Sequence, residues 1–229
     1  MKGEFRLRVA YAKQGRGRWL SHLEVTRALG RTVRRSGLPL AVTRGFHPHL
    51  KLATGPALSV GIAALREYFD LYLTDYVPAM DALTYLQDAQ AELLPISQAA
   101  YVNGSLPSLN AAIELQEICA RIQSAGGDPR QLEAAFADLR TRERLEVEQK
   151  GKTKVFNPTV CIPKDAKAVR KDDTLSLEFC LRISQSGSLR PTALLAALSR
   201  EMDFGAATWE LERTGLFVID DEGVWVAPL

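Results

Sequence analysis

Hydrophobic and polar positions alternate at the start of the chain. The string EFRLRVAY places its apolar side chains on one face of a strand and its charged side chains on the other. The apolar set is Phe5, Leu7, Val9 and Tyr11, and the charged set is Glu4, Arg6 and Arg8. A period of two predicts a half-buried strand with the charged face in water.

The period then changes to that of a helix. Ser21 and Glu24 form an S-x-x-E capping box at the expected helix start. Val25, Leu29 and Val33 follow at helical spacing and predict a buried stripe. Gly37 is placed to end the helix as its C′ residue.

The remainder of the first half alternates between strand and helix patterns. LPLAVT and KLATG read as short strands on either side of a GFHPH turn, and REYFDLYLT reads as a clearer strand. A helix is expected from Pro78, and LLPISQAAYV is expected to close this part as a strand. The turn-rich, uncharged segment 103–110 is the predicted linker.

The second half repeats this order of elements. A strand in AAIELQEICARI precedes a helix that begins at Asp128-Pro129, and TLSLEFCLRI alternates as a strand. Each half therefore reads β-α-β-β-α-β. The prediction is an α+β protein of two tandem ferredoxin-like (βαββαβ) sandwiches, with an N-terminal domain over residues 1–103 and a C-terminal domain over residues 104–229.

Charge is sorted along the chain although its net value is only +2. Residues 1–51 carry twelve Lys/Arg against two acids, and residues 150–171 carry seven against one. The stretches 52–149 and 172–229 are acidic. Two basic blocks in an acidic background predict a polarised surface that meets a polyanion, with internal pairing of the blocks as the alternative.

The predicted helix carries a stripe of arginines opposite its apolar face. Its members, at i, i+4, i+7 and i+8, are Arg27, Arg31, Arg34 and Arg35. Like charges at this spacing repel, and guanidinium groups donate paired hydrogen bonds to phosphate, so an external anion is the favoured explanation. The basic residues expected nearby are Lys13, Arg16 and Arg18 on the preceding Gly-rich loop, and Arg44 and Lys51 after the helix. The phosphate-binding string GxxxxGK[ST] is absent.

The segment TRGFHPHLK supplies a second candidate site. Phe46 is expected either to offer an exposed ring for base stacking or to plug into the core beneath a structural turn. His47 and His49 lack nearby acids or cysteines that would complete a metal site. His22, directly after the cap, and His47 are the weak candidates for acid–base catalysis.

The second basic block includes KGKTK, expected at the tip of a hairpin. Lys152 and Lys154 would make phosphate contacts there that depend on salt and not on base sequence. The alternative is a hairpin whose charge serves solubility.

No cofactor and no metal are predicted. Cys119, Cys161 and Cys180 lack the spacing of a zinc or iron–sulfur site, and buried reduced thiols are expected. No apolar run is long enough to span a bilayer, and the N-terminus lacks a signal peptide's apolar stretch, so a cytoplasmic protein is expected.

The strings over residues 5–73 resemble a known family. Their pattern is roughly K-x-G-x-x-R-[FW]-[LI]-S-H-L-[DE], an Arg-rich helix, LP-x-[AS]-x-[ST]-x-GF-[NH]-P-[HR] and G-x-x-[SA]-x-x-E-Y. This chain is similar to the radical-SAM-linked domain of unknown function 2344, in its stand-alone form. SLRPTALLAAL also fits, while KVFNPTVCIP departs from the family's string around Asn157.

The resemblance implies a module that works beside a radical-SAM enzyme or in RNA processing and ribosome-related pathways, but it assigns no reaction. The favoured function is a non-catalytic RNA-binding or substrate-presenting accessory module, with RNA and a radical-SAM protein as partners. A protein–protein adaptor for a radical-SAM enzyme and a metal-independent ribonuclease using His22 or His47 are the alternatives. Oligomeric state is left open.

Overall fold

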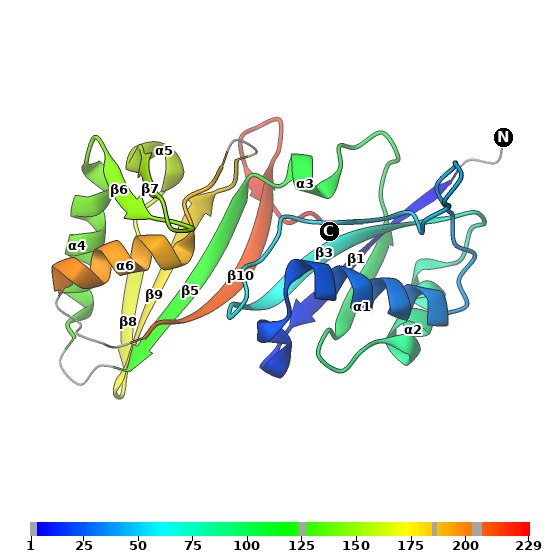
Figure 1. The fold of residues 1–229 in the computed structure, drawn as a ribbon, viewed down its shortest axis with the longest axis horizontal. Coiled ribbons are helices and arrows are strands. Elements are labelled where there is room, and N and C mark those ends of the chain that lie inside the picture. The colour runs from blue at the N-terminus through cyan, green and yellow to red at the C-terminus, as the bar shows by residue number, and fades with distance from the viewer. Residues whose placement is uncertain (1–3, 124–126, 185–186, 203–207) are drawn as a thin grey trace. The chain divides into compact units, whose positions relative to one another are not determined.

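The computed structural model describes residues 4–123, 127–184, 187–202 and 208–229 of the chain. They form an α+β fold, as predicted (Figure 1). The elements are β1 (Phe5–Lys13), η1 (Gly15–Trp19), α1 (His22–Arg35), β2 (Leu52–Thr54), β3 (Ala63–Leu73), α2 (Ala79–Ala89), β4 (Ile96–Tyr101), α3 (Leu109–Ala112), β5 (Leu115–Gln123), α4 (Pro129–Thr141), β6 (Leu145–Glu148), β7 (Thr153–Phe156), α5 (Pro158–Cys161), β8 (Lys167–Lys171), β9 (Thr174–Arg182), α6 (Pro191–Met202), β10 (Glu210–Ile219) and β11 (Trp225–Val226).

The chain divides into two compact units. The first contains Met1–Ile113 and Gly215–Leu229, and the second contains Glu114–Thr214. This division differs from the expected 1–103 and 104–229, because the chain returns to the first unit at its end. Within β10, residues 210–214 belong to the second unit and residues 215–219 to the first. Such a return depends on strand pairing between distant segments, which local periodicity does not reveal.

The sheet of the first unit has the order β4-β1-β3-β10, and β2 also pairs with β3. β1 runs antiparallel to both neighbours, with Val9 opposite Phe69 on one side and Ala99 on the other. The apolar positions of β1 and β3 face α1 and α2, and together they form the core. Of the expected strand LPLAVT, only two isolated bridges form, Leu40 to Leu73 and Val42 to Leu50.

The other face of this sheet holds a buried charge cluster. Asp70 accepts hydrogen bonds from Arg6 (Nη2, 2.6 Å) and Arg8 (Nε, 2.8 Å), and all three side chains are almost completely buried. Arg6 also donates to the carbonyls of Leu106 and Pro107, at 2.6 and 2.8 Å. The prediction that Arg6 and Arg8 face water is therefore wrong.

The second unit has the strand order β10-β5-β9-β8. Its helices α4 and α6 bury their apolar stripes, as in the contact between Phe136 of α4 and Phe179 of β9, whose ring centroids lie 5.8 Å apart. The hairpin β6-β7 and the short helix α5 stand between α4 and β8 in the chain. Among the described helices of both units, none has the length and apolar composition needed to cross a bilayer.

Candidate nucleic-acid interface

Helix α1 begins at the predicted capping box. The backbone N–H of Glu24 donates to Ser21 Oγ at 3.3 Å, and the N–H of Ser21 donates back to Glu24 Oε2 at 2.8 Å. The Ser21 hydroxyl adds a bond of 2.7 Å to the same carboxylate. The two bonds that the Glu24 carboxylate accepts, the hydroxyl's first and the backbone's second, lower its pKa below the ordinary value, and the charge of Arg27 adds a weaker effect. The expected C′ glycine is confirmed, because Gly37 follows the helix with φ of +74°.

Three arginines of the stripe are exposed along one side of α1. Val25, Leu29 and Val33 are buried on its other side, as predicted. Arg27, Arg31 and Arg34 point to solvent, and none of them forms an ion pair with a carboxylate in the four described stretches of the chain, although the charge of Arg27 acts on Glu24 at longer range. Their spacing of four and three residues keeps the three guanidinium groups on one face. This arrangement leaves three like charges to be balanced from outside the fold.

Arg35, the fourth member of the stripe, has a structural contact. Its Nη2 donates to the carbonyl oxygen of Ala89 at 2.6 Å, at the C-terminal end of α2. A cation at this end of a helix satisfies a carbonyl that has no partner within the helix and stabilises the helix dipole. Arg35 therefore links α1 to α2, a role that the stripe pattern alone did not indicate.

The three basic residues before α1 differ in how far the structure exposes them. Arg16 is exposed on η1, whereas Arg18 is half-buried and donates to the carbonyl of Gly61 at 3.0 Å. Lys13 was expected on the loop, but it is the last residue of β1 and has a relative exposure of 2%. Among these three residues, Arg16 is the one placed to meet a large ligand.

The loop of residues 43–49 presents Phe46 to solvent. The N–H of Thr43 donates to the carbonyl of His49 at 2.7 Å, which closes the loop. Phe46 has a relative exposure of 103%, and Arg44 and His47 are also exposed. The alternative in which Phe46 plugs into the core is therefore wrong, and the ring is accessible for stacking.

Lys51 is compensated within the protein. Its Nζ lies 2.6 Å from the Glu4 carboxylate and 5.6 Å from the centroid of the Tyr72 ring. An ion pair of this kind competes with any external phosphate, so Lys51 is a weaker anion ligand than the arginines of α1.

His22 lies at the mouth of a small cavity in the first unit. Its Nε2 lies 3.4 Å from Thr54 Oγ1, and the cavity behind it is lined by the buried side chains of Tyr11, Lys13 and Glu67. The space is enough for about one water molecule. No hydrogen bond joins His22 to His47 among the described residues. Sequence reasoning missed Glu67, although it stands in phase with the inward positions of β3, two residues before Phe69.

The predicted lysines of the second basic block lie in the second unit. Lys150 and Gly151 form the two-residue turn between β6 and β7, both with positive φ, and Lys152 is exposed beside it. Lys154 is half-buried on β7, opposite Val147. The hairpin is confirmed, and its tip carries an exposed cation.

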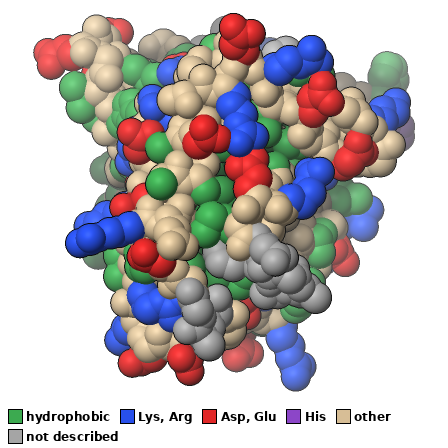
Figure 2. Space-filling model, turned by 90° about the vertical axis from the view of Figure 1, so that its left-hand side faces the viewer, with side chains coloured by type: hydrophobic (Ala, Val, Ile, Leu, Met, Phe, Trp, Pro, Cys, Tyr) green, Lys and Arg blue, Asp and Glu red, His purple; other side chains and the backbone are tan. Residues whose placement is uncertain are grey.

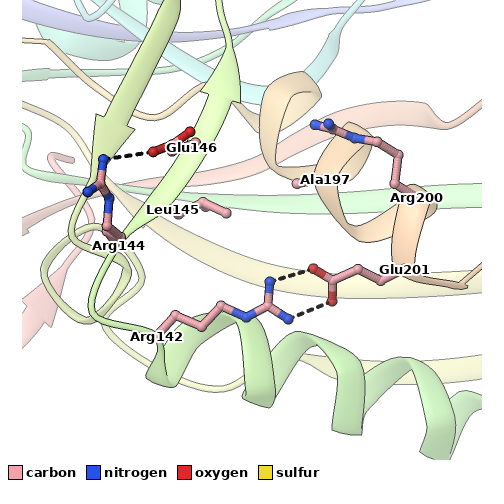
Figure 3. A pocket seen from close by; sticks show the side chains of 7 residues that line it. All are labelled: Arg142, Arg144, Leu145, Glu146, Ala197, Arg200 and Glu201. Carbon is pink, nitrogen blue, oxygen red and sulfur yellow. Dashed lines mark hydrogen bonds and ion pairs between the residues drawn. The ribbon is translucent and has the colours of Figure 1, made fainter.

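A shallow pocket of the second unit also gathers arginines, but these have carboxylate partners. Arg142 pairs with Glu201 at 2.7 Å, and Arg144 pairs with Glu146 at 2.7 Å (Figure 3). Arg142 also pairs with Asp138, at 2.6 Å. Figure 2 shows the face of the second unit on the side of α4 and α6, where basic and acidic side chains are interspersed. This pocket has already balanced much of its charge.

Metal and thiol chemistry add little to the site. No cluster of three metal-ligating side chains occurs in the described residues. Cys119 and Cys180 are buried free thiols, as expected, and Cys161 is half-buried. Burial raises the pKa of Cys180 to about 11, so this thiol is a poor nucleophile near neutral pH.

Comparison with known families identifies the chain's relatives. The model of a family described as "Uncharacterized protein conserved in bacteria (DUF2344)" matches residues 6–191. The chain belongs to this family. The match includes the arginine stripe of α1, the loop with Phe46, and Lys152 and Lys154 of the β6-β7 hairpin. No curated protein matches.

Two solved structures show limited likeness to this family member. A chain of a Cbf5–Nop10–Gar1 complex is 11% identical, with a TM-score of 0.45 over 91% of this chain and 48% of that one. The present chain thus spans about half the length of that chain. An unknown protein from Galdieria sulphuraria is also 11% identical, with a TM-score of 0.27 over 92% of this chain and 99% of that one.

Proposed function

We propose that the first unit binds the phosphate backbone of RNA through Arg27, Arg31 and Arg34. The observation that supports this most directly is that three exposed guanidinium groups share one face of α1 and have no carboxylate partner in the described residues. Their mutual repulsion costs a few tenths of a kcal/mol per pair. A row of phosphates would remove this repulsion and accept paired hydrogen bonds from each planar guanidinium.

Two further exposed groups extend the proposed surface. Arg16 adds a cation before α1, and Phe46 offers a ring on which an unpaired base could stack, at about 1–3 kcal/mol. Arg44, two residues before Phe46, is also exposed. Lys13, Lys51 and Arg35 contribute less, because they are buried or engaged within the protein.

The module is proposed to bind RNA without cleaving it. In metal-independent cleavage a base takes the proton of the attacking 2′-hydroxyl and an acid protonates the leaving 5′-oxygen, so the two groups must stand on either side of one phosphate. His22 opens onto a cavity of about one water, and His47 stands on the separate loop 43–49. We therefore assign presentation of RNA to this surface, within the cytoplasm, with a radical-SAM enzyme as the partner that would act on it.

The tandem ferredoxin-like architecture is part of the same proposal. In the first unit the order β4-β1-β3, with β2 also paired to β3 and with α1 and α2 packed on the sheet, supports a split βαβ sandwich. In the second, β10-β5-β9-β8 with α4 and α6 supports another, enlarged by β6, β7 and α5. The RRM, a module with a four-stranded sheet, is one known RNA-binding fold.

RNA binding is tested by a matched pair of triple variants. Arg27→Gln/Arg31→Gln/Arg34→Gln removes three cations from α1, and Arg142→Gln/Arg144→Gln/Arg200→Gln removes three from the second unit, so both lose the same net charge. Fluorescence anisotropy with labelled single-stranded RNA should show binding by the wild type that weakens with salt. The α1 variant should lose most of this affinity. The slope of log association constant against log salt concentration should become smaller in magnitude by about 2.

The second-unit variant should keep nearly all of its affinity. Equal loss in both variants would show that net charge alone is responsible, and no loss in either would overturn the assignment to α1.

A protein–protein adaptor is the second candidate, because the same three guanidinium groups could meet carboxylates of another protein. Affinity purification from the native cell after nuclease treatment separates the two functions. A protein that stays bound to the wild type and is lost from the α1 variant, in the absence of RNA binding, would establish the adaptor.

A further inference from the structure

β4 forms an open edge of the sheet in the first unit. It pairs with β1 on one side, and no other described strand of this unit pairs with it. An exposed edge of this kind can accept a strand from another chain, because its outward backbone groups lack partners. The side chains from Ser97 to Tyr101 are exposed or half-buried.

The pairing with β1 shows which backbone groups face outward. The N–H of Val102 donates to the carbonyl of Arg6 at 3.0 Å, and the register continues in steps of two through Ala100 with Arg8. Residues at alternate positions in an antiparallel pair bond to the same neighbour, and those between them point the other way. Ala99 and Tyr101 therefore direct both their N–H and their C=O away from β1.

The surroundings of this edge are uncharged and partly apolar. Residues 93–113 contain no acidic or basic side chain. Gln87 of α2 donates to the Ile96 carbonyl at 3.0 Å, so this side of α2 borders β4. Met80, two helical turns earlier on the same side, is 70% exposed. Tyr76, 62% exposed, stacks on the Tyr101 ring at 5.2 Å.

The outer strand of the second unit is protected in the way that natural sheets protect their edges. β8 carries Lys167, Arg170 and Lys171. The Ala168 N–H is bonded to the Glu133 side chain of α4 at 2.7 Å. Charges on an edge and a side chain bonded to its backbone both oppose pairing with another strand. β4 has neither feature in its central residues.

We propose that β4 pairs with β4 of a second copy of this chain, antiparallel and about a two-fold axis. In such an interface the residues near the two-fold axis meet their own symmetry mates, so a charge placed there would face a like charge. The uncharged edge and the flank of α2 meet this requirement. Centred on Ala99, the pairing lets the two alanines exchange both outward hydrogen bonds, and it brings the exposed Met80 and Tyr76 of each copy to the new contact.

Proline at position 99 is the sharpest test. Because the Ala99 N–H points away from β1, Ala99→Pro removes no bond of the monomer's own ladder, and edge strands tolerate such a proline. Light scattering during size-exclusion chromatography, over a series of protein concentrations, should give twice the chain mass for the wild type. It should give the mass of one chain for Ala99→Pro, with an unchanged circular-dichroism spectrum.

Two further variants keep the test decisive if Ala99→Pro unfolds. Met80→Lys should dissociate the dimer by placing like charges across the axis, whereas Val160→Lys, at a comparably exposed apolar site of the second unit, should not. Ala99→Cys should form a disulfide-linked dimer on mild oxidation, beyond any background of the wild type. The proposal is overturned if the wild-type protein has the mass of one chain at every concentration. A dimer that survives Met80→Lys, or equal dissociation by both lysine variants, also overturns it.

Discussion

The arginines of β1 and those of α1 belong to the same N-terminal basic block but have opposite surroundings. Arg6 and Arg8 are buried, share Asp70, and donate to carbonyls of distant segments. Arg27, Arg31 and Arg34 are exposed and have no carboxylate partner in the described residues. Charge counted along the chain thus combines cations that hold the fold together with cations that can bind a ligand.

The largest effect expected from this comparison is on Asp70. Asp70→Asn leaves two buried guanidinium groups without their counter-charge, and breaking a buried pair in this way costs about 3–5 kcal/mol. Urea denaturation should show this loss in the free energy of unfolding. Asp81→Asn, on the exposed face of α2, is the control and should change it by less than about 1 kcal/mol. Similar results for both variants would show that the cluster on β1 contributes little to stability.

The next effect concerns the cap that holds α1 and its arginines. Ser21→Ala removes the oxygen that accepts the Glu24 N–H, and should cost about 1 kcal/mol in thermal or urea unfolding.

The stabilisation that the Glu24 carboxylate of this cap provides should be lost at acidic pH. The folded protein lowers the pKa of Glu24 below its ordinary value of 4.5, so the contribution of this carboxylate is complete above that pH and is lost as pH falls through the lower folded pKa. Ser21→Ala should flatten this part of the pH dependence of stability. An unchanged profile would contradict the assignment.

A smaller effect is expected for the paired arginines of the second unit. Arg142 bonds to two carboxylates, but it is partly exposed, and surface pairs typically contribute 0–1 kcal/mol. Arg142→Gln should lower the free energy of unfolding by less than about 1 kcal/mol, and high salt should reduce the difference further. A loss near that expected for Asp70→Asn would mean that solvent screening at this pair is weak.

The smallest effect has the opposite sign. Arg27→Gln/Arg31→Gln/Arg34→Gln removes like charges from one helix face, and should raise the free energy of unfolding by a few tenths of a kcal/mol at low salt. Differential scanning calorimetry at low and high salt measures it. A destabilised variant would show that these arginines, like those of β1, have partners within the fold.

Local periodicity was sufficient for the elements that bury one face. It predicted β1, α1 with its cap and its C′ glycine, and the alternation of β9. It failed where distant segments cover a surface. Arg6 and Arg8 read as solvent-facing because nothing near them in sequence shows that residues 106, 107 and 228 lie over them.

The candidate site was predicted in part for the same reason. The exposure of Arg27 and Arg31 follows from helical phase, since they lie opposite Val25, Leu29 and Val33. The bond from Arg35 to Ala89 and the burial of Lys13 depend on how α2 and β3 pack, and no spacing in the sequence encodes them.

The return of β10 to the first unit has a consequence for biosynthesis. Domains usually fold in the order in which the ribosome makes them. Here residues 114–214 form a unit that can complete itself as soon as it emerges, while the earlier segment waits for residues 215–229. The part of the molecule that is translated first is the part that matures last.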